Sequence, residues 1–222
     1  PVSRRVPGSI DHFGRGNNFN ILSIRRRIMA QFVAFNPKVE VNGETVLSVV
    51  DGMGAFRDRA YKFLESNGIV NPEAGKWYSQ QAWLNAFKAI AQATGDYSLF
   101  NIGKKIPENA KFPPEINSIE KALAAIDVAY HMNHRIDGKI LFDPATGAMQ
   151  EGIGHYRSEK TGEREIRMVC DNPYPSDFDR GIIEAMAQKF KPTGAGIVIV
   201  KLDDSRPTRK KGADSCTYIV RW

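Results

Sequence analysis

The spacing of apolar residues changes near residue 136, from mostly helical to mostly strand-like. Before that point, apolar side chains recur three and four positions apart in residues 55–67, 79–93 and 117–130. This is the period of amphipathic helices. The first of these segments stops at Gly68, a residue type common just beyond a helix end. The N-terminal part of the chain is therefore predicted to form a layer of helices.

One short segment of this helical part has a different pattern. Residues 39–47 place β-branched residues on both sides of the pair Asn42-Gly43. An Asn-Gly pair between such runs is typical of a tight two-residue turn. We therefore predict a small β-hairpin over residues 39–47, ahead of the helices.

Past residue 136, apolar and polar residues alternate with the period of two that half-buried strands show. This alternation covers residues 152–157 and 163–170, with a turn at 160–162 between them, and returns in residues 215–222. An almost continuously apolar run precedes the last of these, in residues 196–202.

Between the strand pairs, an amphipathic helix begins at Ser176, after the Pro-rich turn that ends the second strand. The order is strand, strand, helix, strand, strand. We predict an α+β fold in which the N-terminal helical layer packs on a C-terminal antiparallel sheet.

Composition agrees with a folded domain. The chain has 222 residues, and 42% of them are apolar, enough for a substantial core. No apolar run approaches the roughly 20 residues of a membrane helix, and the N-terminus lacks the apolar core of a signal peptide. Two cysteines are compatible with a reducing compartment. These features predict a cytoplasmic protein that does not span a membrane.

The formal charge of +6 comes partly from two basic runs, residues 25–27 and 206–211. The second run lies between two strand-like segments, where a solvated loop is expected. Neither run has interleaved aromatic residues, and no zinc-finger or RNP spacing is present. Direct nucleic-acid binding is not expected.

The first 35 residues are rich in Gly and Asn and contain a short apolar helix pattern from Ile24 to Phe32. We interpret residues 1–35 as an arm whose arginines contact a second copy of the chain, making a homodimer. Residues 36–222 are then the ligand-binding domain.

The C-terminal half carries a recognisable set of residues. Cys170 is followed by Phe178-x-x-Gly181, by Asp203-Asp204 at a strand end, by a basic loop, and by Gly212-x-x-x-Cys216-x-Tyr218. This pattern resembles the vinyl-4-reductase-like domain family, which is similar in fold to the heme-NO-binding (H-NOX) sensor domains. The resemblance implies a module that holds a small apolar or aromatic molecule between helices and sheet, often as a dimeric sensor of a transcription activator.

The resemblance also implies a zinc site in some members, built from a Cys, a Glu-x-x-Cys and a final Cys. Cys170 and Cys216 match the first and last positions. The middle pair is missing, with Asp203 and Asp204 near its place. A structural zinc site usually has four ligands, so zinc is possible but the site is incomplete. We expect buried thiols on neighbouring strands.

Histidines offer a second candidate metal site. His131 and His134 lie three apart on a predicted helix, and His155 lies on a strand that could cover them. A pair between His131 and Asp127, one turn before it, is the simpler explanation. The heme-binding relatives share a Tyr-x-Ser-x-Arg motif, which Tyr156-Arg157-Ser158 does not match, so heme is disfavoured.

No sequence motif of an enzyme is present: there is no Gly-x-Ser-x-Gly, Walker or dinucleotide-binding pattern. Asp171, Asp177 and Asp179 fit the first turn of a helix, where carboxylates are favourable. We predict a sensory or regulatory module that is not an enzyme. The alternatives are a metal-dependent or tetrapyrrole-related enzyme using the three histidines, and a ligand-free scaffold. The residues predicted to line the pocket are Phe63, Trp83, Phe87, Ile126 and Tyr130.

Overall fold

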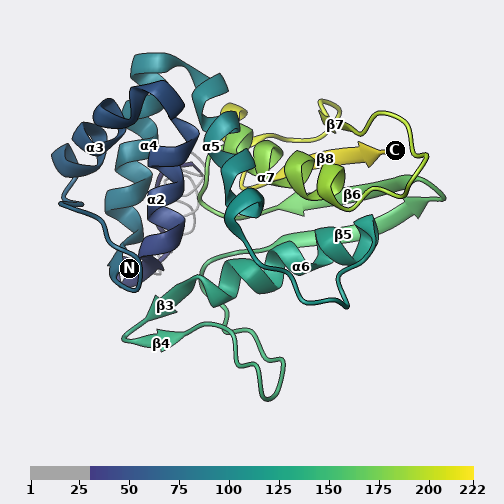
Figure 1. Ribbon diagram of the computed structural model, residues 1–222, viewed down its shortest axis with the longest axis horizontal. Helices are drawn as coiled ribbons and strands as arrows, with labels where there is room; N and C mark the ends of the chain where they lie inside the picture. Colours follow the sequence, from purple (N-terminus) through teal and green to yellow (C-terminus); the bar gives the residue numbers. More distant parts are fainter. Residues whose placement is uncertain (1–30) are drawn as a thin grey trace, which may run out of the picture.

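The computed structural model describes residues 31–222. Its first half is mainly helical, with one short strand ahead of the described helices and one between them (Figure 1). The elements are β1 (Val39–Asn42), α2 (Gly43–Gly52), a 3-10 turn (Gly54–Phe56), α3 (Arg57–Ser66), β2 (Trp77–Ser79), α4 (Gln80–Thr94), α5 (Asp96–Asn109) and α6 (Ile119–Met132).

The second half contains the main antiparallel sheet, whose strand order is β5-β6-β8-β7. The elements of this second half are β3 (His134–Ile136), β4 (Lys139–Ile140), β5 (Tyr156–Gly162), β6 (Glu165–Cys170), α7 (Ser176–Lys189), β7 (Ile199–Leu202), a 3-10 turn (Arg209–Lys211) and β8 (Cys216–Arg221). The α+β class and the order strand, strand, helix, strand, strand are confirmed.

Figure 1 shows α2, α3 and α4 gathered on one side of the molecule and the main sheet on the other, with α5 and α7 between them. Helix α6 runs beside β5. A cluster of aromatic rings joins the two halves: the ring of Trp83 on α4 lies 5.2 Å from that of Tyr174 and 5.9 Å from that of Phe178 on α7. Such pairs add to the stabilisation that burial alone provides.

Helices α5 and α7 cross very closely because each has a glycine at the contact. A Cβ atom at Gly103 would lie 2.1 Å from the carbonyl oxygen of Phe178. One at Gly181 would lie 2.2 Å from the carbonyl oxygen of Phe100. The neighbouring atoms are backbone, which cannot move aside without separating the helices.

Replacing Gly103 with alanine should therefore destabilise the fold by about 1–3 kcal/mol, the usual cost of overpacking. Urea unfolding measures the change. Gly196→Ala is the matched control, because a Cβ there meets no atom within 4 Å. Equal stability of the two variants would contradict the close helix crossing.

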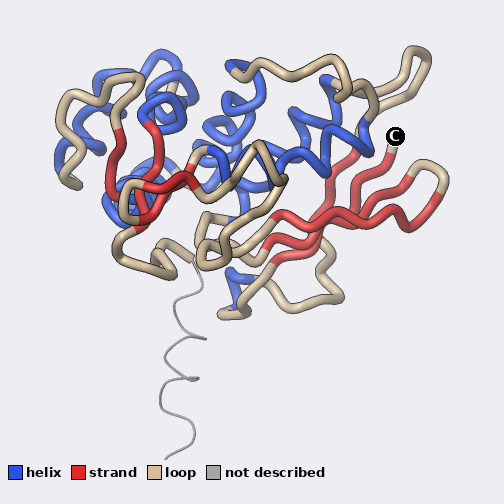
Figure 2. Tube along the Cα trace, turned by 90° about the horizontal axis from the view of Figure 1, so that it is seen from below, coloured by secondary structure: helices blue, strands red, loops and turns tan. Residues whose placement is uncertain are grey.

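The predicted hairpin over residues 39–47 is wrong. The Asn42 side chain accepts a hydrogen bond from the backbone N–H of Thr45 (2.9 Å) and so begins helix α2 instead of a turn. Strand β1 pairs with β2 and β3, which come from distant parts of the chain, in a second sheet of order β2-β1-β3-β4. Figure 2 shows this sheet apart from the main one.

Most of the predicted N-terminal arm, residues 1–30, lies outside the described residues. The described end of the arm attaches to the start of α7: the Phe32 N–H donates to the carbonyl oxygen of Pro173 (2.8 Å), and the Ser176 N–H donates to the Gln31 side chain (3.0 Å). The homodimer contact stays a prediction. Within residues 31–222, no helix has both the length and the apolar character that crossing a bilayer requires.

Candidate functional site

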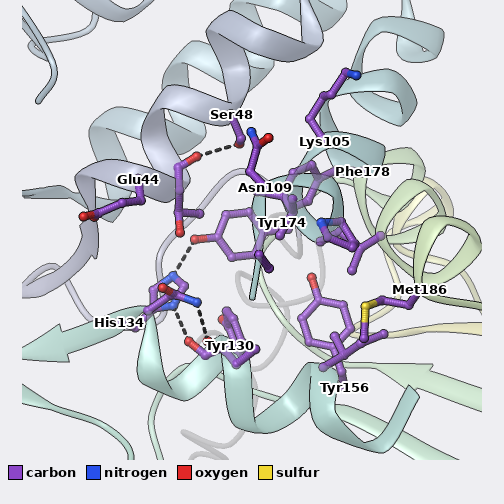
Figure 3. A pocket seen from close by; sticks show the side chains of 18 of the residues that line it. Glu44, Ser48, Lys105, Asn109, Tyr130, His134, Tyr156, Tyr174, Phe178 and Met186 are labelled. Carbon is purple, nitrogen blue, oxygen red and sulfur yellow. Dashed lines mark hydrogen bonds between the residues drawn. The ribbon is translucent and has the colours of Figure 1, made fainter. Parts of the chain in front are cut away.

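A cavity of about 200 Å³ lies where the helical layer meets the sheet, between α2, α5, α6, α7 and β5. Its wall is mainly apolar and aromatic, and Figure 3 shows the three phenol rings of Tyr130, Tyr156 and Tyr174 turned towards it. Polar residues gather at one side, where Glu44 and Asn109 are exposed. The wall consists chiefly of Trp83, Ile106, Phe112, Ile126, Tyr130, Tyr156, Tyr174, Phe178, Ile182 and Met186, and the polar members include Glu44, Ser48, Lys105, Asn109 and His134.

His134, the first residue of β3, is the histidine of this cavity, and it is buried. Its Nδ1 lies 2.6 Å from the carbonyl oxygen of Tyr130, which can only accept, so Nδ1 carries the proton. Its Nε2 then accepts from the hydroxyl of Tyr174 (2.7 Å), and that hydroxyl also accepts from the Gln80 side chain (3.1 Å). Burial lowers the pKa of His134 to about 4, so the ring is neutral at pH 7.

A buried ion pair lies behind the cavity wall. The hydroxyl of Tyr156 donates to Asp179 (2.5 Å), and Asp179 pairs with Arg209; both charged side chains are fully buried. Burial raises the pKa of Asp179, and the guanidinium of Arg209 opposes this shift. Two sequence interpretations are corrected here. Asp179 does more than favour a helix terminus, and Arg209 is not part of a solvated loop, although its neighbour Lys210 is exposed.

Of the three histidines grouped by the sequence, His131 and His155 lie together, whereas His134 lies at the cavity. His131 does not line the cavity, and its ring lies 5.0 Å from that of His155. Asp127 joins this pair: its carboxylate Oδ2 lies 2.9 Å from Nδ1 of His155. Hydrogen bonds of His155 with Asp127 and Glu151 outweigh its burial and raise the pKa of the ring.

The two cysteines are directly opposite each other on β6 and β8, as the sequence predicted, and both are free and buried. Burial raises the pKa of Cys170. Cys216 Sγ lies 3.1 Å from the hydroxyl of Ser176. The carboxylate of Asp203 accepts from Ser205, and Asp204 is exposed. Within the described residues, the group spaced to share a metal ion is Asp127, His131 and His155, without either thiol.

The cavity brings together three of the residues proposed for the pocket, Trp83, Ile126 and Tyr130. Phe87 packs behind Trp83, with 4.6 Å between the ring centres, and Phe63 lies on α3, away from the wall. Their part in ligand binding stays a prediction. Sequence reasoning missed Tyr156, Tyr174, Phe178 and the cavity position of His134. The signal available for Tyr174 was an aromatic residue between the two prolines of the turn before α7.

Solved structures that share this fold include H-NOX proteins. One, from a study of heme distortion in the H-NOX family, is 14% identical, covers 82% of this chain and 94% of its own, and has a TM-score of 0.56. An H-NOX protein from S. oneidensis in the Fe(II)NO state is 12% identical over 81% of this chain and 98% of its own (TM-score 0.56). An oxygen-binding H-NOX domain related to soluble guanylate cyclases is 13% identical over 81% and 94% (TM-score 0.55).

These likenesses confirm the H-NOX-like fold. No family model and no curated protein matches the sequence, so the vinyl-4-reductase-like assignment is not shown. The expectation that heme is disfavoured is overturned, because the structures that share the fold include ones described by their heme. That expectation depended on the Tyr-x-Ser-x-Arg motif, and it overlooked that Tyr156 and Ser158 stand at the motif spacing, with Lys160 in place of the arginine.

Proposed function

We propose that this chain is a small-molecule sensory domain and that the cavity lined by Trp83, Tyr174 and His134 is its ligand site. The observation that carries the proposal is the cavity itself, at the junction of the helical layer and the sheet, with a mostly apolar wall and one neutral, buried histidine. Ligand sites commonly combine such a wall with a few polar groups that orient the ligand. A ligand-free scaffold would not need this hollow in its core.

The first candidate occupant is heme, since the structural neighbours include heme proteins. The donor chemistry of the site fits heme through His134. A histidine that ligates a metal usually donates its other ring N–H to a carbonyl or carboxylate, and Nδ1 of His134 already donates to Tyr130. Heme, when bound, supplies an iron that takes a histidine nitrogen and a diatomic gas. Lys105, at the wall, offers a positive charge to a propionate.

Heme also requires a change in this cavity. Nε2 of His134 must leave the hydroxyl of Tyr174, and the volume of about 200 Å³ is below the roughly 300–1,000 Å³ of typical ligand sites. The rings of Tyr174 and Phe178 would have to separate from the opposite wall.

The second candidate occupant is an apolar or aromatic molecule bound without iron. The mostly apolar wall favours it, and so do the two hydrogen bonds that already satisfy both nitrogens of His134. Such a ligand leaves the histidine as it is. Its affinity comes from desolvation, about 25 cal/mol for each Å² of apolar surface removed from water.

Hemin titration followed by absorption spectroscopy distinguishes the two occupants. If heme binds through His134, the protein gives the spectrum of histidine-ligated iron, and His134→Gln loses it. Tyr174→Phe is the informative partner variant, because it removes the hydrogen bond that competes for Nε2. It should tighten hemin binding roughly 2–10-fold, the worth of one net hydrogen bond.

The apolar occupant predicts a different set of results. Hemin then gives no histidine-ligated spectrum, and small aromatic probes such as indole or naphthalene raise the melting temperature. Ile182 lines the cavity, so the larger side chain of Ile182→Trp should fill it and abolish the rise in melting temperature. If neither hemin nor any aromatic probe binds, the sensory proposal is wrong.

A further inference from the structure

A second cluster of metal-binding side chains lies at α6, among residues that do not line the cavity. Asp127 and His131 come from α6, and His155 comes from the segment just before β5. One ligand atom of each lies within 4.8 Å of those of the other two. We propose that these three side chains bind one divalent transition-metal ion, separately from the ligand cavity.

His131 provides the first argument. Its side chain is fully buried, and its Nδ1 lies 2.8 Å from the backbone carbonyl oxygen of Asp127, so this nitrogen carries the proton. Its Nε2 is buried and has no hydrogen-bond partner in the described structure. A buried acceptor without a partner costs free energy, about 1–3 kcal/mol. A metal ion would use the unpaired lone pair of Nε2.

His155 has the complementary arrangement. Its Nε2 lies 3.0 Å from the carboxylate of Glu151, and its Nδ1 lies beside Asp127 Oδ2. Because Asp127 Oδ2 can only accept, Nδ1 donates to it; a metal ion would displace this proton, while the proton on Nε2 would stay donated to Glu151. In the metal-bound protein each histidine would then have one nitrogen held by an oxygen and the other on the ion, the usual arrangement around a ligating imidazole.

A backbone hydrogen bond also fixes the orientation of the Asp127 carboxylate. Its Oδ1 accepts from the backbone N–H of Tyr156 (2.9 Å), which leaves Oδ2 at the cluster. The carboxylate is 14% exposed and His155 is 10% exposed, so an ion can enter from solvent. Two imidazoles and one carboxylate are a common donor set for Zn²⁺ and other borderline divalent ions, with a fourth position left for water.

The ion would join α6 to the segment that leads into β5. It would add to the hydrogen bonds that already link Asp127 on α6 to His155 and to the backbone N–H of Tyr156. The site uses neither His134 nor Tyr174, so it does not depend on what occupies the cavity. Metal binding at this site should therefore stabilise the fold whether or not the sensory proposal holds.

Zn²⁺ titration of the chelator-treated full chain tests the site. Native mass spectrometry should show one Zn²⁺ per chain, and calorimetry should show that His155→Gln and Asp127→Asn weaken binding by more than about 100-fold, since even outer partners contribute roughly 10–100-fold. Glu151→Gln changes an exposed side chain, so it should fold normally and weaken binding by roughly 10-fold.

Asp137→Asn is the matched control, because it removes an exposed carboxylate remote from the cluster, and it should bind Zn²⁺ as the unchanged protein does. Tyr174→Phe should also bind Zn²⁺ normally, which separates this site from the cavity. The proposal is overturned if the unchanged chain takes up no stoichiometric Zn²⁺. It is equally overturned if His155→Gln, Asp127→Asn and Glu151→Gln all bind Zn²⁺ with unchanged affinity.

Discussion

Replacing Arg209 with methionine should lower the free energy of unfolding by about 3–5 kcal/mol, the cost of removing one partner of a buried ion pair. Arg209 donates to the carboxylate of Asp179 and to the side chain of Asn172 (2.8 Å). Both charged side chains have no exposed surface. Without the guanidinium, Asp179 must either remain a lone buried charge or take up a proton, because burial already raises its pKa.

Urea unfolding of the single and double variants measures this effect. Asp179→Asn should cost a similar amount, since it leaves the guanidinium without its anion. The double variant Asp179→Leu with Arg209→Met leaves no lone charge, so it should lose less than the two single losses added together. The exposed pair Glu73–Lys76 is the control, where Glu73→Gln should change stability by no more than about 1 kcal/mol. A loss below 1 kcal/mol for Arg209→Met would contradict the buried pair.

The C-terminal half was predictable because local pattern and tertiary structure agree there. The alternation of residues 163–170 and 215–222 matches β6 and β8, whose inner faces are buried in the same period of two. Cys170 and Cys216 could be placed together because each falls on the inward face of its strand. Where a sheet buries one face, the sequence pattern determines which residues share it.

The N-terminal half was less predictable because distant contacts override local signals. Asn42-Gly43 is typical of a hairpin, yet the same asparagine also suits a helix start, and pairing of β1 with β2 and β3 selects the helix. Helix α5 was missed because Pro107 and two adjacent lysines interrupt its apolar stripe. Its stability comes from the close crossing with α7.

Most of the site could not be predicted from the sequence, again because contacts between distant residues form it. His134 and Tyr174 are 40 residues apart, and nothing in either neighbourhood indicates that their side chains meet. Arg209 belongs to a basic run that looks solvated, and only the fold shows that one member of the run is buried. Asp127 and His131 were recognised as an intrahelical pair, and His155 as a residue that a strand could bring over the helix; the meeting of all three side chains depends on how β5 lies beside α6.

Lowering the pH from 7 to 4 should destabilise the protein through His134 by about 3 kcal/mol. In the unfolded chain this histidine has the ordinary pKa of about 6.5, and in the folded protein burial lowers the pKa to about 4. Below pH 6.5 the unfolded state therefore binds a proton that the folded state does not. Stability from this group is complete above pH 6.5 and is lost as the pH falls through 4, at about 1.4 kcal/mol per pH unit.

The comparison of the unchanged protein with His134→Gln isolates this contribution from other titrating groups, including His155, whose raised pKa acts in the opposite direction. Urea unfolding at several pH values between 4 and 7 gives, for each of the two proteins, the slope of the free energy of unfolding against pH. The variant is expected to be less stable at pH 7, because the hydrogen bonds with Tyr130 and Tyr174 are weakened. Its free energy of unfolding should depend less steeply on pH, because unfolding of the variant takes up nearly one proton fewer in this pH range. Equal slopes for the two proteins would mean that His134 titrates normally and that the cavity wall around it is open to water.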